Sequence, residues 1–465
     1  MYPRSPYAPR NPWPPKQPII STCPDWIIEQ VVSSLELADI RNLRLTGKTV
    51  SLKSSQGRFR CFLQSKNVDL TSEALQTFVE TKGYTSKLKN LNLVGLAVKP
   101  NQQKEADKIQ ERETLLLTEV FNKIAEYNGD GCLESLTLRV ILVHKDGTRQ
   151  LPADASKFPW EYIPKRIWAC AVYTWKVALR ALAASRLRIK RLNAFNDANM
   201  QQCSIPCDRL TTVDLQDIGL AESLASLKSL SLSICDRIFD LDKDIPEYDK
   251  NYDYGSISEA KSEELRDFQA EADEENNFDG VANLVNLCGR IEDFELHHYH
   301  NRKERLTVKF HAERILQCLV ELEQLPRLRK SKLRGISATG TDLLNYIIRT
   351  DPSDLTLERI KLQKGEFSPN IDHCTSDQAH LHTLLLDTLY EDKGKYFEMV
   401  LFPWYKGCKA IVQGIDSEVG RAESLKREGN DIRQPLLFIV SLAHFQGSPV
   451  NQAYSQRNRL EFGAW

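Results

Sequence analysis

The chain lacks an excess of charge of either sign. Its 465 residues carry 62 Lys and Arg against 63 Asp and Glu, which gives a formal net charge of −1 at pH 7. Such a balance provides no general attraction to nucleic acid or to an anionic membrane surface. We therefore expect neither nucleic acid nor a membrane as a partner.

The cysteines lack the paired spacing of metal or redox motifs. Eleven are scattered along the chain without a CxxC pair, and Cys203 and Cys207 in CSIPC have no matching pair downstream. An odd number spread through a large chain is typical of reduced thiols in the cytosol or nucleus. The sequence thus predicts a cytoplasmic or nuclear protein.

The chain also has few long apolar runs, and no basic region followed by an apolar one suggests a secretory signal. The longest runs are residues 167–184, which include Lys176 and Arg180, and residues 435–445. A membrane-spanning helix needs about 20 mostly apolar residues. Both runs are interpreted as packed elements of a soluble protein.

Nucleotide-binding and acyl-transfer motifs are absent: there is no GxxxxGK[ST] loop, no GxGxxG after a strand and no GxSxG turn. Missing motifs do not exclude catalysis, but no pair of acidic residues stands out for acid–base work. No catalytic or cofactor-binding residue is nominated, and we do not expect an enzyme.

Two groups of histidines could in principle bind metal. In HHYH (297–300), His298 and His300 would face the same side of a strand, but no cysteine or carboxylate at ligand spacing completes a set. The second group, at unfamiliar spacing, consists of His373, Cys374, His380 and His382. We predict a surface cluster at HHYH and no metal site, with zinc as the alternative at both places.

Proline is concentrated in residues 1–18, MYPRSPYAPRNPWPPKQP. Proline has no amide donor and favours the polyproline II conformation. Residues 1–18 are predicted to be a disordered leader. The alternative is a ligand for an SH3 or WW module, because Pro9 and Pro12 have PxxP spacing.

Residues 23–50, CPDWIIEQVVSSLELADIRNLRLTGKTV, combine two apolar helical stripes with little between them. Pro24 suits the first turn of a helix, Asp25 favours the positive end of its dipole, and Asp39 can cap a second helix. The stripes consist of Ile27, Ile28, Val31, Val32, Leu35, Ile40 and Leu43. Because so short a segment cannot bury both stripes by itself, it needs another surface.

This segment resembles an F-box motif. Pro24-Asp25-Trp26-Ile27-Ile28 and the later Leu-Arg-Leu-Thr-x-Lys (43–48) match the usual form, and residues 44–78 are similar to the continuation in F-box proteins of filamentous fungi. Cys23 stands where leucine is usual. Cysteine is smaller but still apolar when buried, so we expect weaker packing there rather than lost function.

The resemblance implies a partner and a function. F-box helices dock on the Skp adaptor of a Skp–cullin–F-box ubiquitin ligase, which brings a cullin, and the remainder of the chain recruits a protein target for ubiquitination and proteasomal degradation. The implied adaptor contacts are Pro24, Ile27, Ile28, Val31, Leu35, Ile40 and Leu43. The alternative is an ordinary helical hairpin that packs on its own domain.

Beyond residue 80 a pattern recurs in which apolar residues occupy the first, fourth and sixth positions. Copies begin at Leu88, Leu133, Leu210, Leu227, Ile291, Leu357 and Leu381, with a damaged copy at 328–333 that has Ser331 in the middle. This is the strand signature of a leucine-rich repeat. Helical stretches at 113–127, 172–185 and 311–325 lie between copies. We predict an α/β fold: a short all-helical F-box, then an irregular leucine-rich-repeat-like solenoid of parallel strands with outer helices.

The repeat is irregular, with 45 residues from Leu93 to Leu138 but 24 from Leu362 to Leu386. A regular array has about 20–29. A generic α/β domain is therefore the alternative. The predicted regions are the leader (1–18), the F-box (19–66), the repeat-like domain (67–402) with an acidic insertion (236–279), and a C-terminal cap with a flexible tail (403–465).

Three functional alternatives stay open. The acidic insertion is expected to be partly disordered, or it docks a basic substrate. The chain could bind the adaptor as a scaffold without cullin-dependent ubiquitination. It could also be an enzyme of unrecognised class that uses the histidine-containing loops.

Overall fold

The computed structural model describes fifteen stretches of the chain in two compact units, Met1–Lys66 and Asn67–Trp465. The described residues are 20–55, 64–81, 88–97, 106–128, 130–144, 146–152, 163–197, 200, 202–236, 266–267, 269–301, 310–394, 397–403, 421–441 and 461–464. The leader and most of the acidic insertion lie outside them. We call the first unit the N-terminal unit and the second the body.

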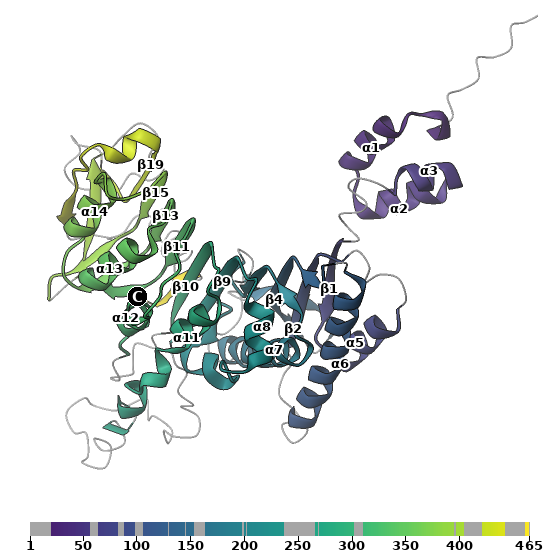
Figure 1. Ribbon diagram of the computed structural model, residues 1–465, viewed down its shortest axis with the longest axis horizontal. Coiled ribbons are helices and arrows are strands. Elements are labelled where there is room, and N and C mark those ends of the chain that lie inside the picture. The colour runs from purple at the N-terminus through teal and green to yellow at the C-terminus, as the bar shows by residue number, and fades with distance from the viewer. Residues whose placement is uncertain are drawn as a thin grey trace, which may run out of the picture. The chain divides into compact units, whose positions relative to one another are not determined.

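Residues 20–55 of the N-terminal unit form a short 3₁₀ turn and three helices (Figure 1). They are η1 (Ile20–Thr22), α1 (Asp25–Ser34), α2 (Leu37–Leu45) and α3 (Lys48–Lys53). Pro24 lies immediately before α1, and Asp25 is in its first turn. Asp39 was expected to cap the second helix; instead α2 begins at Leu37, and Asp39 lies within its first turn.

The three helices form a small core of their own. Ile28 and Val32 of α1 and Ile40 of α2 are buried together, and Cys23, Leu35 and Leu43 pack against them. Lys53 of α3 donates to the carbonyl of Cys23 over 2.7 Å and pairs with Asp25 over 3.2 Å, which ties α3 to the start of α1. The segment was expected to be unable to bury both stripes by itself; it buries part of each in a core of its own and leaves Val31 exposed.

The body is built on an open, mostly parallel sheet whose main strands follow one another in sequence order (Figure 1). They are β1 (Ser65–Asp69), β2 (Asn90–Ala97), β4 (Ser135–Val143), β7 (Arg191–Ala194), β9 (Ser229–Cys235), β10 (Asp293–Asn301), β11 (Lys330–Arg334), β13 (Asp354–Glu358), β15 (Thr383–Asp387) and β19 (Ser424–Glu428). Neighbours from β2 to β15 pair parallel, and β19 is antiparallel. The predicted α/β class with a parallel sheet is confirmed.

The apolar positions of the recurring pattern stack in two rows across this sheet. Residues two apart in a strand share a face, so equivalent positions of neighbouring strands meet. One row is Leu91, Leu136, Leu192, Leu230, Phe294, Ser331, Leu355 and Leu384; the other is Leu93, Leu138, Ala194, Leu232, Leu296, Leu333, Leu357 and Leu386. All are buried. The hydroxyl groups of Ser331 and Tyr346 are hydrogen-bonded over 2.9 Å, which satisfies the polar interruption.

Three details of the predicted repeat differ from the structure. Residues 210–212, the first half of one predicted copy, belong to the 3₁₀ helix η5 (Cys207–Thr212) rather than to a strand. The copy at 357–362 spans the end of β13 and the start of β14, with Arg359 at a positive φ between them. Strand β7 was not predicted, because Ala194 occupies its last apolar position.

Helices connect the strands and gather along one side of the sheet (Figure 1). They are α5 (Ser72–Glu80), α6 (Ala106–Tyr127), α7 (Ile163–Ser185), α8 (Ile218–Leu224), α11 (Gly280–Leu287), α12 (Glu313–Glu321), α13 (Gly340–Thr350) and α14 (Ser368–Thr375). Side chains of Thr71, Asp217 and Thr339 accept hydrogen bonds from the first turns of α5, α8 and α13. Such caps satisfy amide groups that have no partner inside the helix.

Helix α7 has the length and apolar composition of a membrane span over Arg166–Ser185. More than half of this window is buried inside the protein, as in a core helix. It packs closely on β2 at Gly95, where a Cβ atom would lie 2.1 Å from the Thr174 hydroxyl oxygen. The interpretation of this run as a packed element agrees with these contacts.

A second, smaller sheet and several short strands complete the body. The sheet contains β12 (Ser337–Thr339), β14 (Lys361–Lys364), β16 (Tyr390–Asp392), β17 (Phe397–Pro403), β18 (Arg421–Ala422) and β20 (Ile439–Ser441). The short strands are β3 (Cys132–Leu133), β5 (Arg149–Gln150), β6 (Arg188–Ile189), β8 (Ile205–Pro206) and β21 (Gly463–Ala464), and further 3₁₀ turns are η6 (Glu275–Asn277) and η7 (Gly429–Arg433).

The last described residues return to the middle of the body. Strand β21 pairs in parallel with the end of β10, and Phe462 is buried beside it. The Phe462 ring packs edge-on against His297, and the guanidinium groups of Arg334 and Arg359 lie 5.4 and 5.1 Å from its centre. The expectation of a flexible tail is therefore wrong for residues 461–464.

Candidate functional site

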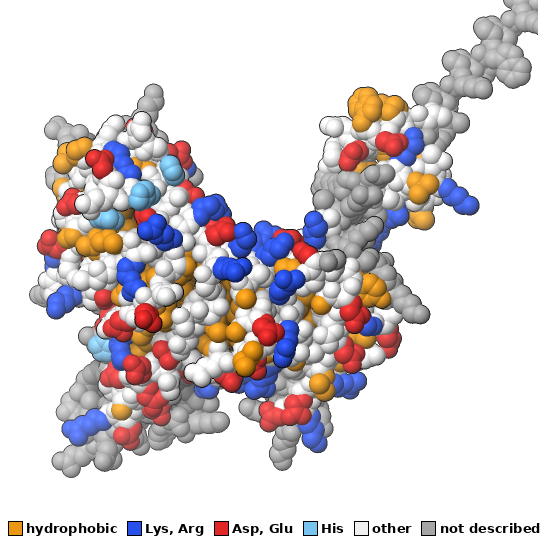
Figure 2. Space-filling view, in the orientation of Figure 1, with side chains coloured by type: hydrophobic (Ala, Val, Ile, Leu, Met, Phe, Trp, Pro, Cys, Tyr) orange, Lys and Arg blue, Asp and Glu red, His pale blue; other side chains and the backbone are white. Residues whose placement is uncertain are grey.

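The N-terminal unit leaves large apolar side chains on its surface. Trp26 is 69% exposed, Val31 39%, Leu45 85% and Leu52 72%. Hydrophobic side chains are visible on this unit in Figure 2. Single exposed apolar residues are ordinary, whereas contiguous apolar patches mark binding sites; these four side chains are distributed over α1, α2 and α3. We call these four residues the apolar surface of the N-terminal unit.

The structure divides the predicted adaptor contacts into two groups. Pro24 and Val31 are exposed, and Ile27, Leu35 and Leu43 are half-buried. Ile28 and Ile40 are fully buried in the unit's own core, so a partner reaches them only if that core opens. Trp26, Leu45 and Leu52 were not predicted as contacts, although they are the most exposed apolar side chains in the described part of the unit.

Helical geometry explains this division. Residues 28 and 32 are four apart and share the inward face of α1, whereas residues 27 and 31 form a neighbouring row at its margin. The sequence shows one wide stripe, and only the packing of α2 and α3 decides which row is buried. The exposed Leu52 lies on α3, a helix that the apolar pattern did not indicate.

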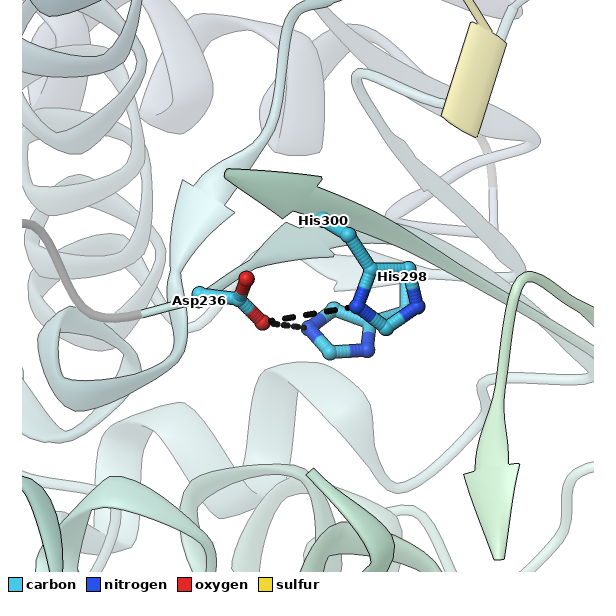
Figure 3. A group of neighbouring side chains, drawn as sticks. All are labelled: Asp236, His298 and His300. Atoms are coloured by element: carbon cyan, nitrogen blue, oxygen red, sulfur yellow. Dashed lines mark ion pairs between the residues drawn. The ribbon is translucent and has the colours of Figure 1, made fainter. Parts of the chain in front are cut away.

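The histidines of β10 are buried, contrary to the predicted surface cluster. Nδ1 of His297 lies 2.9 Å from the Ser233 hydroxyl oxygen, and its Nε2 lies 2.8 Å from the carbonyl oxygen of Glu461. His298 and His300 share the other face of β10, with ring centres 4.3 Å apart, and both approach Asp236 (Figure 3). Asp236 is the carboxylate that sequence spacing could not supply.

The second predicted group does not come together. Cys374 is buried in α14, and burial raises the pKa of its thiol to about 12. His380 pairs with Asp351 over 2.8 Å, and His382 is exposed. Within the part of the chain that the structure describes, Asp236, His298 and His300 are the one group of three possible ligands whose donor atoms all lie within 4.8 Å.

Burial makes several of the described thiols poor nucleophiles. All nine described cysteines are free. Burial raises the pKa of Cys170 and Cys288 to about 12, and that of Cys203 and Cys235 well above its usual value. Nucleophilic cysteines need the opposite shift, toward the thiolate.

Taken together, these observations define an α/β protein with a large, mostly parallel open sheet, preceded by a separate helical unit that exposes apolar side chains. No model of a known protein family matches the chain, and no curated protein matches it either.

Proposed function

We propose that this chain is the substrate-recruiting subunit of a Skp–cullin–F-box ubiquitin ligase. The N-terminal unit binds the Skp adaptor, and the body binds a protein target. The observation that carries the proposal is the apolar surface of the N-terminal unit, on a unit that has a core separate from that of the body. It coincides with the stretch whose sequence resembles an F-box.

The energetics of that surface favour a partner. Full burial of one large apolar side chain is worth about 1.5–3 kcal/mol, and four such residues lie on three short helices. Among the described residues, their shared core contains Ile28, Val32 and Ile40, and Val50 of α3 is also buried. A bound adaptor would cover the exposed residues and add apolar area that the unit cannot supply.

The body is interpreted as an irregular leucine-rich-repeat-like solenoid. Its support is the order of the strands, each paired with the next along the chain, and the two stacked apolar rows. In repeat proteins each unit buries its apolar face on its neighbours in this way. The generic α/β domain stays the alternative interpretation.

The face of the sheet opposite the apolar rows is polar and charged. Cross-strand ion pairs there include Lys332–Glu295 at 2.9 Å and Arg334–Glu358 at 2.8 Å. Lysine, arginine and acidic side chains are interspersed over the visible face of the body (Figure 2). Mixed charges of this kind suit recognition of a particular protein surface rather than general binding to a polyanion.

In this proposal the chain performs no bond chemistry. It raises the effective concentration of target lysines near the conjugating enzyme that the cullin brings. Skp–cullin–F-box ligases act in the cytoplasm and nucleus, which agrees with the reduced thiols expected from the sequence.

A binding experiment with the Skp adaptor tests the proposal. The full-length chain should capture the adaptor, and Ile27→Asp with Val31→Asp should abolish capture, because each aspartate places an unpaired charge in an apolar interface. Ile348→Asp is the matched control, since it changes an exposed isoleucine of the body. Equal capture by the wild type and the double variant would refute the docking model.

Co-purification of the cullin distinguishes a substrate-recruiting subunit from an adaptor-binding scaffold. A chain that recruits targets for ubiquitination should co-purify with the cullin as well as the adaptor. Adaptor without cullin would favour the scaffold.

A further inference from the structure

The sheet brings Asp236, His298 and His300 to one place. Strands β9 and β10 are parallel, and Cys235 is paired with Tyr299 at the end of their register. Asp236 follows β9 directly and so reaches the level of His300. His298 and His300 lie on the same face of β10 as Phe294 and Leu296, because alternate residues of a strand share a face. They follow these two residues toward the carboxyl end of the strand.

The donor atoms are separated as a metal ion requires. Nε2 of His298 lies 2.9 Å from Oδ1 of Asp236, and Nδ1 of His300 lies 3.7 Å from the same oxygen (Figure 3). A tetrahedral ion with bonds of about 2.0–2.1 Å holds its ligands about 3.3 Å apart. The two separations bracket that value, so small side-chain rotations would place an ion between the three groups.

A hydrogen bond on the side of His300 away from Asp236 determines which ring nitrogen carries the proton and which presents its lone pair to Asp236. Nε2 of His300 lies 2.7 Å from the carbonyl oxygen of Gly335, which only accepts, so Nε2 carries the proton. With the proton on Nε2, Nδ1 is the ring nitrogen that faces Asp236. Metal-binding histidines usually donate their other N–H to a carbonyl or carboxylate in this way.

The backbone at Gly335 is built for this contact. Gly335 has φ +69°, and a Cβ atom there would lie 2.3 Å from the carbonyl oxygen of His298. Any side chain would therefore push β10 away from the turn. The glycine allows the close approach that aims its carbonyl at His300.

The environment favours a cation at this point. Asp236, His298 and His300 are all buried, and neither ring nitrogen of His298, including the Nε2 that faces Asp236, makes a hydrogen bond within the described residues. An ion bound between the three side chains would accept lone pairs from both imidazoles and from the Asp236 carboxylate, whose donor atoms all lie within 4.8 Å of one another.

We propose that Asp236, His298 and His300 form a binding site for a divalent first-row transition metal, with zinc as the ion that fits best. Two imidazoles and one carboxylate are a donor set that zinc accepts readily. Three protein ligands leave a coordination position for a further ligand. The inference is independent of adaptor binding, because it concerns only the body.

Elemental analysis and a zinc titration of the full-length, tag-free chain test this site. The chain is first stripped with a chelator and then titrated with Zn²⁺ alone. The wild type should bind about one ion per chain, and added Zn²⁺ should raise its melting temperature, because an ion that binds only the folded state stabilises it. Asp236→Asn and His298→Gln should each weaken binding more than about 100-fold, beyond the loss typical of an outer-sphere partner.

His380→Gln is the matched control, since His380 lies on the surface outside the group, and it should bind zinc like the wild type. Circular dichroism verifies that each variant is folded. If the ligand variants do not fold, the visible absorption of Co²⁺ added to the stripped wild type reports whether nitrogen and oxygen ligands enclose the ion. Absence of stoichiometric metal in the folded wild type, or unchanged zinc affinity in folded Asp236→Asn and His298→Gln, would overturn the proposal.

Discussion

The N-terminal unit and the body differ in how completely they bury their apolar side chains. The body stacks leucine on leucine across consecutive strands, so that one continuous core extends from Val68 to Ile432. The N-terminal unit buries Ile28, Val32 and Ile40 and exposes Trp26, Leu45 and Leu52. A small unit has too much surface for its volume to bury everything it carries. We therefore expect the body to be stable by itself, and we propose that the N-terminal unit gains stability from a partner.

Truncation of a stacked leucine should give the largest effect. Leu232→Ala removes a fully buried side chain from the middle of one apolar row, and we expect a loss of about 2–5 kcal/mol in the free energy of unfolding. Leu115→Ala, the same substitution at an exposed position of α6, is the control and should cost far less. Urea unfolding followed by circular dichroism measures both. Equal losses would contradict the continuous core.

The same kind of truncation in the N-terminal unit should act locally. Ile28→Ala removes one of the three fully buried side chains, so the unit should unfold while the body stays folded. Limited proteolysis should then cleave within residues 20–55 and leave the body intact. Val31→Ala, on the exposed side of α1, should remain resistant. Joint unfolding of unit and body would mean that the two are not separate.

Substitution of Ser331, the polar residue in one of the apolar rows, should have an intermediate effect on stability. Ser331→Ala leaves the Tyr346 hydroxyl without its partner in a buried site, which should cost about 1–3 kcal/mol. Addition of Tyr346→Phe removes the orphaned hydroxyl and should restore most of the loss. Chemical denaturation of the two variants and of Tyr346→Phe completes the cycle. A double variant that is less stable than Ser331→Ala would show that the pair is not the cause.

Substitution of Glu113, a buried carboxyl of the body, should give the smallest effect, which should be visible in the pH dependence of the free energy of unfolding. Glu113 accepts hydrogen bonds from the Tyr173 hydroxyl and the Ser72 amide, yet burial raises its pKa above the usual value. The folded state then holds this proton more tightly than the unfolded state. The free energy of unfolding should therefore decrease as the pH rises above about 4.5.

The Glu113→Gln variant should lose that decrease, whereas Glu119→Gln, at an exposed position of the same helix, should keep it. Denaturant unfolding at a series of pH values measures the slope. An unchanged slope in Glu113→Gln relative to the wild type would contradict the raised pKa of this carboxyl.

The local spacing of apolar residues predicted most strands of the main sheet, because this spacing itself places the residues on one face of a strand. It failed where the same spacing suits another backbone: Leu210 and its neighbours form a 3₁₀ helix, and β7 ends in alanine. Which row of α1 is buried depended on α3, which no apolar period indicated.

The local sequence pattern could not predict that Asp236 lies beside His298 and His300. Aspartate and histidines are far apart in the sequence and meet only because β9 and β10 are neighbours in the sheet. The HxH spacing gave the correct face of the strand. The third residue required the register of two strands, which a single sequence does not contain.

Hydrogen exchange of the full-length chain, with and without the Skp adaptor, tests the central claim most directly. The account predicts that the adaptor slows amide exchange in α1, α2 and α3 and leaves the strands of the body unchanged, because the apolar surface of the N-terminal unit is what the adaptor covers. Unchanged exchange throughout residues 20–55 in the presence of excess adaptor would contradict it.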